Sequence, residues 1–489
     1  MKVLRTTTTM CPECAQPLPG RVVLDEEADK VYLERTCPVH GAYRLLQSNH
    51  GAAYAKFDHQ YILLQQRPGN TKEVTSYWAF ITRTCDSQCE YCVFRLEYPL
   101  FDNMSMDDFR QMLRKAGKAK LTMAGGEPTN HPQILEFMRE AQEQGFAVRL
   151  CTNGIRLAEE TFFQQVAALE PDEIRLSIAA LDDDVAPESA GNRFHEPKLQ
   201  ALRNLERHGI PTTLAPIIFR NKNTEMIRKA VEYAHSRAFV HSIAVAGLSL
   251  IGRARDLDSG DMIMPDELMD ILHKDFAEGP REDALTFQRV IMAVADLLGT
   301  RMCLYAQLML FVRARDRMRP ITDYLNMGRI DRAMTRWERI AHKGRLRRGF
   351  GLFRVLASGL RLRSLPLVPH VVRMFFAHIT AIRTSRFPKK LLVVMLNTDC
   401  CLENADTAVT RECMGGAFML QEGEVRRSLN GYLTFEMDER LKGHEPLFGQ
   451  DDVKRQGLDV SMAKSIPIQP EEKPHAEEDN TTGGVEPPE

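Results

Sequence analysis

The 489-residue sequence contains no apolar run long enough to cross a membrane. A membrane-spanning helix needs roughly 18 to 20 mainly uncharged residues, and the most apolar stretch, residues 351–382, is interrupted by four arginines and two prolines. Residues 1–10 also lack the apolar core of a secretory signal, because a threonine run follows the charged start. We therefore expect a cytoplasmic protein that does not span a membrane.

Two common cofactor-binding motifs are also missing. The sequence has neither a Walker phosphate-binding loop nor a glycine fingerprint for dinucleotides, and it has no internal repeat. It does contain eleven cysteines. In a chain without a secretory signal, cysteines indicate metal ligands in a reducing compartment rather than disulfides.

The net charge of −2 hides an uneven distribution. Residues 311–390 contain 20 Lys and Arg against 4 Asp and Glu, whereas residues 441–489 contain 5 basic and 11 acidic residues. At about 150 residues per domain, the length predicts three domains. We expect a metal-binding ribbon at residues 1–55, a barrel at 72–300, a basic and mainly helical region at 301–440, and an acidic, largely disordered tail at 441–489.

The N-terminal segment carries four candidate metal ligands. Cys11 and Cys14 form one Cys-Pro-x-Cys knuckle, and Cys37 and His40 form a second one, Cys-Pro-x-His-Gly. Between them, residues 21–24 and 30–33 alternate as in a β-hairpin. A hairpin flanked by two knuckles brings three sulfurs and one imidazole to a tetrahedral point, which suits zinc or iron.

Three further cysteines stand in a Cys-x3-Cys-x2-Cys pattern at Cys85, Cys89 and Cys92. This spacing wraps a short loop around a [4Fe-4S] cluster and leaves the fourth iron without a protein ligand. Taken alone, the pattern also fits a zinc site. Tyr91 precedes the third cysteine, and a Gly-Gly-Glu-Pro-Thr run follows at residues 125–129.

The chain around this loop predicts an α/β fold with a partial (βα)6 parallel barrel. Helical stretches at residues 106–116 and 134–144 lie between strands. The six predicted strands are residues 77–82, 120–123, 147–151, 173–178, 212–218 and 242–246.

In such barrels the chemistry lies at the carboxyl ends of the strands. The cysteine loop follows the first strand, Gly125, Gly126 and Glu127 follow the second, Asn153 follows the third, and Ser177 ends the fourth. The glycines would let the backbone approach a ligand closely, and Glu127 could accept a hydrogen bond from an ammonium group.

Together these motifs resemble the radical S-adenosylmethionine (SAM) superfamily. The N-terminal knuckles, Arg175-Leu176-Ser177-Ile178, Leu214-Ala215-Pro216-Ile217 and Gly252-Arg253 further resemble the group that contains tetraether-lipid synthases and pterin methyltransferases. The resemblance implies that Cys85, Cys89 and Cys92 hold the [4Fe-4S] cluster, and that Tyr91 lies near the adenine of SAM. It also implies that Gly125, Gly126 and Glu127 engage the methionyl amine, with Asn153 and Ser177 near the ribose or carboxylate.

The same resemblance implies an iron-sulfur enzyme that cleaves SAM to a 5'-deoxyadenosyl radical, with flavodoxin or ferredoxin as the one-electron donor. The radical would abstract hydrogen from an unactivated carbon. We expect a lipid acyl chain as substrate, with C–C coupling or methyl transfer as outcome. The alternatives are a soluble pterin-like or peptide substrate, or a non-enzymatic iron-sulfur electron carrier or metal-binding interaction protein.

Four cysteines beyond the first 300 residues could hold an auxiliary [4Fe-4S] cluster. The alternative is that Cys303, like Cys151 in the barrel region, is a buried small hydrophobic residue. The four candidate ligands are Cys303, Cys400, Cys401 and Cys413.

The basic region contains a segment with helical periodicity after Pro369, with apolar residues at 372, 375, 376, 379 and 382. A basic amphipathic helix can lie on an anionic membrane, here the inner face, as a peripheral anchor. The alternatives are a helix that packs on the barrel with a solvated basic face, and RNA binding. Nucleic-acid binding is the weakest of the three, because few aromatic residues stand among the arginines.

Overall fold

The computed structural model describes residues 1–65, 76–87, 89–93, 103–116, 120–179, 181, 195–299, 302–379, 388–406, 409, 417–419 and 425–427. The predicted tail at 441–489 and Cys413 lie outside the described residues. Within the described residues, no helix combines the length and the apolar character that a membrane span requires.

The chain begins with a four-stranded antiparallel sheet in the order β1-β2-β3-β4. The strands are β1 (Lys2–Met10), β2 (Pro17–Asp25), β3 (Lys30–Cys37) and β4 (Gly41–Ser48). The pairing of β2 with β3 confirms the predicted hairpin. Helix α1 (Gly51–Gln65) follows and packs beside α8 (Glu282–Leu297).

A second, larger sheet forms the body of the protein. Its parallel strands run in the order β14-β11-β9-β8-β7-β6-β5. All six predicted strands are present, and β10 (Ile217–Ile218) continues the fifth after a break at Pro216. The strands are β5 (Ser76–Thr82), β6 (Lys120–Gly125), β7 (Ala147–Thr152), β8 (Glu173–Ser177), β9 (Thr212–Ala215), β11 (Val240–Gly247) and β14 (Leu391–Thr398).

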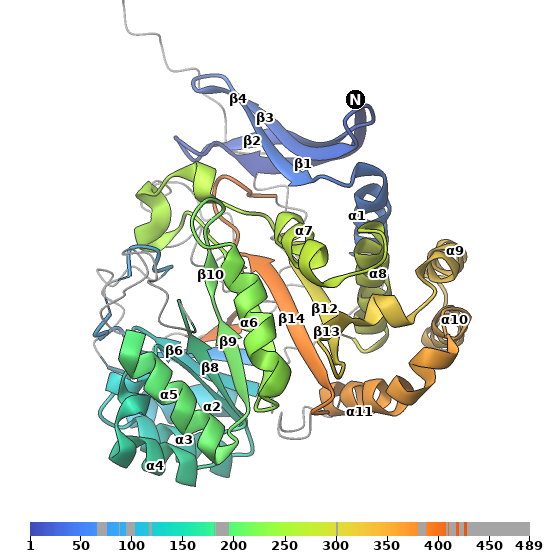
Figure 1. Cartoon of the computed structure of the whole chain (residues 1–489). Helices are drawn as coiled ribbons and strands as arrows, with labels where there is room; N and C mark the ends of the chain where they lie inside the picture. Colours follow the sequence, from blue (N-terminus) through green and yellow to red (C-terminus); the bar gives the residue numbers. More distant parts are fainter. Residues whose placement is uncertain are drawn as a thin grey trace, which may run out of the picture.

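Helices cover one face of this sheet, and the two predicted helices are confirmed as α2 and α3 (Figure 1). The helices are α2 (Met106–Lys115), α3 (Ile134–Glu143), α4 (Glu160–Ala168), α5 (His195–His208), α6 (Glu225–Ser236) and α7 (Pro265–Phe276). The connections between successive parallel strands run through these helices, as expected for βα units.

The two faces of the strands contribute to different apolar clusters. Side chains such as Leu121, Leu150 and Leu176 face the helices and are fully buried in the main core. Alternate side chains such as Phe80 and Ala124 face the other way, toward the barrel interior, and belong to a second cluster with Tyr91. Because strand side chains alternate between faces, each strand forms a wall between the core and the interior.

The described residues between 302 and 427 are only partly helical, whereas the sequence pattern predicts a mainly helical region. Strand β14 joins the parallel sheet beside β11, and β12 (Ala306–Arg313) pairs with it antiparallel, followed by β13 (Met318–Pro320). The helices of this region are α9 (Met327–Glu338), α10 (Arg345–Ser358) and α11 (Val368–Ile379), with a 3-10 helix η8 (Leu362–Leu367) before α11. Two further short strands, β15 (Ala417–Met419) and β16 (Val425–Arg427), extend the sheet beyond β5.

The N-terminal sheet sits on the segment 400–406, which leads away from the end of β14. Arg5 and Thr7 both contact the Asp406 carboxylate, at 2.6 and 2.7 Å, and Arg35 donates to the Glu403 carbonyl at 2.7 Å. Met10, Ala15, Leu402 and Ala405 form a small apolar cluster at the same junction. The N-terminal sheet is therefore attached to the barrel by buried polar and apolar contacts.

Candidate functional site

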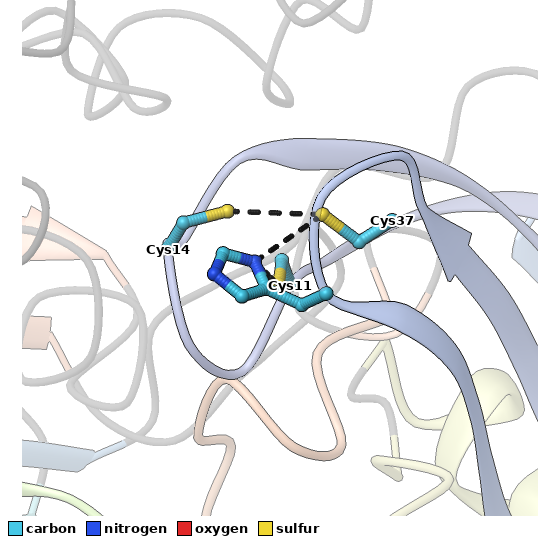
Figure 2. A group of neighbouring side chains, drawn as sticks. Cys11, Cys14 and Cys37 are labelled. Carbon is cyan, nitrogen blue, oxygen red and sulfur yellow. Dashed lines mark hydrogen bonds between the residues drawn. The ribbon is translucent and has the colours of Figure 1, made fainter. Parts of the chain in front are cut away.

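The four predicted ligands of the N-terminal module meet at one point. Their ligand atoms all lie within 4.8 Å of one another. The His40 Nδ1 atom lies 3.5 Å from the sulfurs of both Cys11 and Cys37, and the Cys14 and Cys37 sulfurs are 3.9 Å apart. Figure 2 shows the three cysteine side chains converging from the two knuckles. Three sulfurs and one imidazole nitrogen at these separations fit a single tetrahedral zinc ion.

Backbone hydrogen bonds favour the thiolate form of one of these ligands, Cys37. Burial raises the pKa of the Cys37 thiol, but the backbone N–H groups of His40 and Val39 donate to its sulfur and bring the pKa down to about 7. The thiolate is the metal-binding form. Behind the ligands, Tyr43 donates a 2.6 Å hydrogen bond to Glu13, whose carboxylate also faces the His40 Nε2 atom at 3.7 Å. This contact orients the imidazole so that Nδ1 points at the sulfurs.

The cysteine loop after β5 is held at both ends by other barrel loops. Near its start, the backbone N–H of Glu127, in the loop after β6, donates to the carbonyl of Thr84 at 2.8 Å. Near its end, the backbone N–H of Arg253 donates to the carbonyl of Cys92 at 3.0 Å. Cys85, Cys89 and Cys92 are each partly exposed and free of disulfides. Three cysteine side chains on one short loop, fixed by backbone contacts, fit a cluster that binds one thiolate per iron.

Gly125 and Gly126 are needed for a different reason from the one the sequence suggested. Gly125 has φ +134°, and a Cβ there would lie 2.2 Å from the Thr82 carbonyl oxygen. A Cβ on Gly126 would lie 2.5 Å from the carbonyl oxygens of Arg83 and Thr84. The glycines therefore let this segment pack directly against the chain that enters the cysteine loop. Contact of these glycines with a ligand stays a prediction.

Glu127 is the centre of a buried hydrogen-bond network. One carboxylate oxygen accepts from the Thr129 and Thr152 hydroxyls at 2.6 and 2.7 Å and from the Thr129 N–H at 3.1 Å. The other accepts from the Asn153 N–H at 2.7 Å. Burial raises the pKa of this carboxyl, and these donors act in the opposite direction. The network joins the ends of β6 and β7, and the second oxygen can still accept from a ligand ammonium.

Asn153 extends this network to the cysteine loop. Its side-chain amide donates to the Asp86 carboxylate at 2.6 Å and lies 3.3 Å from the Ser87 hydroxyl. The predicted site residues after β5, β6 and β7 are thus brought together. Ser177 ends β8 beside Ala215, where its side chain is partly exposed. Its place near the ribose or carboxylate of SAM stays a prediction.

Tyr91 packs in the interior cluster. Its ring makes an edge contact with Phe219, with centroids 5.8 Å apart, and only 7% of the residue is exposed. Burial, together with the neighbouring Cys89, raises the pKa of the phenol well above its ordinary value. The side chain of Asn223 holds the backbone at Phe219 in place. It accepts a hydrogen bond from the Phe219 N–H at 2.8 Å and donates one to the Ile217 carbonyl at 2.9 Å.

Two residues of the site were not predicted from the sequence. Lys198 on α5 is 7% exposed. Burial lowers the pKa of its ammonium group, although the nearby Cys89 and Glu127 act to raise it. No sequence pattern distinguishes this lysine from others on an amphipathic helix. Arg175 on β8 lies with its guanidinium carbon 5.7 Å from the Trp78 ring centroid and makes no hydrogen bond or ion pair within the described residues.

The C-terminal cysteines do not share one environment. Cys400 belongs to the main core, whereas Cys401 belongs to the interior cluster, with its sulfur 3.9 Å from the Met262 sulfur. Cys303 is partly buried against the main core. Adjacent side chains in different clusters point apart, which makes joint ligation by Cys400 and Cys401 difficult. The auxiliary cluster stays a prediction, with Cys413 outside the described residues.

Comparison with protein families agrees with both metal sites. Residues 80–234 match the model of the Radical SAM superfamily, and residues 3–48 match that of the HMPTM N-terminal zinc ribbon domain. The chain therefore carries a zinc ribbon followed by a radical SAM domain, with the [4Fe-4S] cluster and SAM as the cofactors that this domain implies. The predicted resemblance to the radical SAM superfamily is confirmed, and the ribbon match is consistent with the predicted group of tetraether-lipid synthases and pterin methyltransferases.

Among the curated proteins that match part of the chain are a methyltransferase and a peptide cyclase. The 7,8-dihydro-6-hydroxymethylpterin dimethyltransferase of Methanocaldococcus jannaschii is 24% identical over 290 residues, which are 54% of this chain and 57% of that protein. The PqqA peptide cyclase of Streptomyces rochei is 26% identical over 181 residues, 36% of this chain and 50% of that protein. The chain thus spans about half the length of these relatives.

Among solved structures, Streptococcus suis SuiB bound to precursor peptide SuiA matches 46% of this chain and 48% of its own. The TM-score is 0.36 and the sequence identity is 15%.

Proposed function

We propose that this chain, whose residues 80–234 form a radical SAM domain, cleaves SAM reductively and uses the resulting radical to remove hydrogen from an unactivated carbon. The observation that carries the proposal is the convergence of three barrel loops on the cysteine loop. Glu127 and Asn153 link the ends of β6 and β7 to Asp86, and Arg253 bonds Cys92. This arrangement holds three cysteine side chains at the carboxyl ends of parallel strands, where barrel chemistry takes place.

A [4Fe-4S] cluster on Cys85, Cys89 and Cys92 would supply the electron that splits the sulfonium of SAM. The chain's own residues would position the cofactor. Glu127 retains acceptor capacity for the methionyl amine, and Tyr91 supplies an apolar ring beside the loop. A small one-electron donor such as flavodoxin or ferredoxin would reduce the cluster from outside.

The substrate that we propose first is a lipid acyl chain, with C–C coupling or methyl transfer as the outcome. It is supported by several apolar side chains that stand at inward-facing positions of the barrel strands and are only partly buried. Examples are Trp78, Ile217 and Met395. An acyl chain would cover such surface without needing polar partners.

A second candidate is a pterin-like ring, and two observations favour it. One is the shared zinc ribbon and the match to the pterin dimethyltransferase. The other is Arg175 beside Trp78, since a planar polar ring can stack on an indole and accept hydrogen bonds from a guanidinium.

The test supplies the reconstituted protein with SAM, a reductant and a perdeuterated substrate. Transfer of deuterium from a phospholipid acyl chain into 5'-deoxyadenosine supports the lipid, and transfer from a methyl-labelled pterin supports the ring. In the second case Arg175→Ala should raise KM about tenfold or more, since it removes a hydrogen bond to a charged donor. Cleavage of SAM without deuterium from either class would contradict both substrates but leave the radical chemistry standing.

A further inference from the structure

The basic region exposes an unusual concentration of apolar side chains. Twelve large hydrophobic residues are exposed among the described residues, and nine of them fall between positions 346 and 372. The most exposed are Leu346 at 91%, Leu362 at 88%, and Phe350 and Phe353 at 66% each. Single exposed apolar residues are ordinary on protein surfaces, but a continuous group indicates an interaction site. The nine are Leu346, Phe350, Phe353, Leu356, Leu360, Leu362, Leu365, Val368 and Val372.

Helix α10 has two apolar faces, and only one of them packs on the protein. Leu352 and Val355 are buried in the main core, and Arg348 on the same side forms an ion pair with the buried Asp296. Leu346, Phe350 and Phe353 have helical spacing i, i+4 and i+7 and therefore share the face that points away. Burial of the inward face explains why the helix is stable. It does not explain why the outward face is apolar.

The segment of the chain that carries this surface has charges of one sign only. Residues 339–398 contain thirteen Lys and Arg and no Asp or Glu. Arg348 and Arg363 are used internally, by Asp296 and by the Asp323 carbonyl. The other arginines next to the apolar side chains are exposed and form no ion pair within the described residues. These are Arg345, Arg347, Arg354, Arg361 and Arg373.

From these observations we infer that α10, η8 and the start of α11 form a docking surface for an anionic lipid bilayer. Apolar side chains that protrude as far as Leu346 and Leu362 need deep matching pockets on a protein partner. A fluid acyl layer takes them up without such pockets, while the arginines reach the headgroup phosphates. A nucleic acid would satisfy the arginines but leave the nine apolar side chains uncovered.

The docking surface lies apart from the cysteine loop. Helices α9 and α10 pack on α8, beside β12 and β13, which end the strand order opposite β5 (Figure 1). The surface therefore holds the enzyme at the membrane and does not line the site of chemistry. This inference is independent of the substrate, since a membrane-bound enzyme can act on lipid or on soluble molecules.

The test is co-sedimentation of the full chain with vesicles of phosphatidylcholine alone and of phosphatidylcholine with phosphatidylglycerol. We expect binding to the anionic vesicles, weakened by salt, and little binding to the neutral ones. Two variants remove different parts of the surface: Phe350→Asp with Phe353→Asp, and Arg347→Glu with Arg354→Glu. Each should lower the partition coefficient on the order of tenfold or more.

Val3→Asp is the matched control, because Val3 is also exposed, at 49%, but lies on the N-terminal sheet. It should bind vesicles as the wild type does. Circular dichroism checks that each variant folds, and the charge variant leaves the apolar face intact. Formation of 5'-deoxyadenosine without vesicles should be unchanged in all variants, which separates failure of docking from failure of the proposed function.

Absence of binding to anionic vesicles would overturn the inference. So would equal binding by the wild type and both double variants. A preference for RNA over vesicles, or a dimer in light scattering that the Phe350→Asp and Phe353→Asp changes dissociate, would assign the surface to a different occupant and contradict it.

Discussion

The side-chain amide of Asn153 donates a 2.6 Å hydrogen bond to the carboxylate of Asp86, and so joins the loop after β7 to the cysteine loop after β5. The backbone N–H of Asn153 also donates to Glu127. One residue thus connects the three loops in which the predicted cofactor ligands lie. The geometry of the cysteine loop depends on neighbouring barrel strands as well as on its own sequence.

Asn153→Ala should disturb SAM cleavage more than folding. A hydrogen bond to a charged group contributes about 1.5–3 kcal/mol, so loss of its positioning effect should lower the rate of 5'-deoxyadenosine formation roughly 10- to 100-fold. Asn221→Ala is the control, since that side chain is on the surface and its contacts are long, at 3.5 Å. Equal rates for the two variants would show that the link to Asp86 does not position the loop.

Gly252→Ala should displace the cysteine loop at its far end. Gly252 has φ +60°, and a Cβ there would lie 2.5 Å from the Val93 carbonyl oxygen and 2.7 Å from that of Cys92. We expect less iron bound per chain after reconstitution. Gly209→Ala is a matched control, because Gly209 has φ +64° but no atom within 4 Å of an added Cβ. If both variants lose the same amount of iron, backbone strain alone explains the effect.

Removal of the zinc ligand Cys14 should loosen the junction between the ribbon and the barrel. A zinc ribbon without its metal loses its fold, and the contacts of Arg5 and Arg35 with residues 403–406 would be lost with it. Cys14→Ser should therefore lower zinc content and the first thermal transition. Calorimetry of the variant beside the chelator-treated wild type measures this. An unchanged melting profile in zinc-depleted protein would contradict a structural role for the metal.

The contact of His50 with Asp270 should give stability that depends on pH. The two side chains are 2.9 Å apart, and this hydrogen bond raises the pKa of His50. Because the pKa of His50 is raised in the folded state, the contact stabilises the fold fully below about pH 6.5, the ordinary pKa of histidine. This stabilisation is lost as the pH rises through the folded-state pKa. Burial raises the pKa of Asp270, but His50 and Arg281 lower it overall, so its contribution is lost only in more acid solution.

His50→Gln should therefore cost about 1 kcal/mol of unfolding free energy near pH 6 and much less near pH 9. Urea unfolding at the two pH values measures the difference. The same cost at both would show that the charge on His50 does not stabilise the fold. Arg281 donates to both Asp266 and Asp270, so these carboxylates are already matched by a cation without a metal ion.

The sequence predicted the barrel strands well because each carries a short apolar run bounded by turn residues. It also located the zinc site, since four ligands in two knuckles are a local pattern. Strand β14 was missed because it joins the sheet next to β11 from residues 391–398, far along the chain. Residues 391–398 are themselves a short apolar run, but the arginine-rich helices before them suggested a helical region, and the pairing with β11 has no local signal.

The site residues show the same limit. Cys85, Cys89 and Cys92 are close together in sequence and were recognised from their spacing. Lys198 enters the site only because α5 folds beside it, and its neighbours along the chain carry no sign of this role. Arg175 stands in the motif that ends at Ile178, but only the fold shows that its side chain lies beside Trp78. The reason for Gly126 was likewise hidden, because the carbonyl groups that it approaches belong to a different strand end.

The most direct test of the central claim is anaerobic incubation of the reconstituted protein with dithionite and SAM, followed by measurement of 5'-deoxyadenosine. We predict its formation by the wild type and its loss in Cys89→Ala, with zinc content and the fold of the ribbon unchanged. Failure of the wild type, fully loaded with cluster, to form 5'-deoxyadenosine would contradict the claim. Equal formation by Cys89→Ala would contradict the assignment of the cluster to this loop.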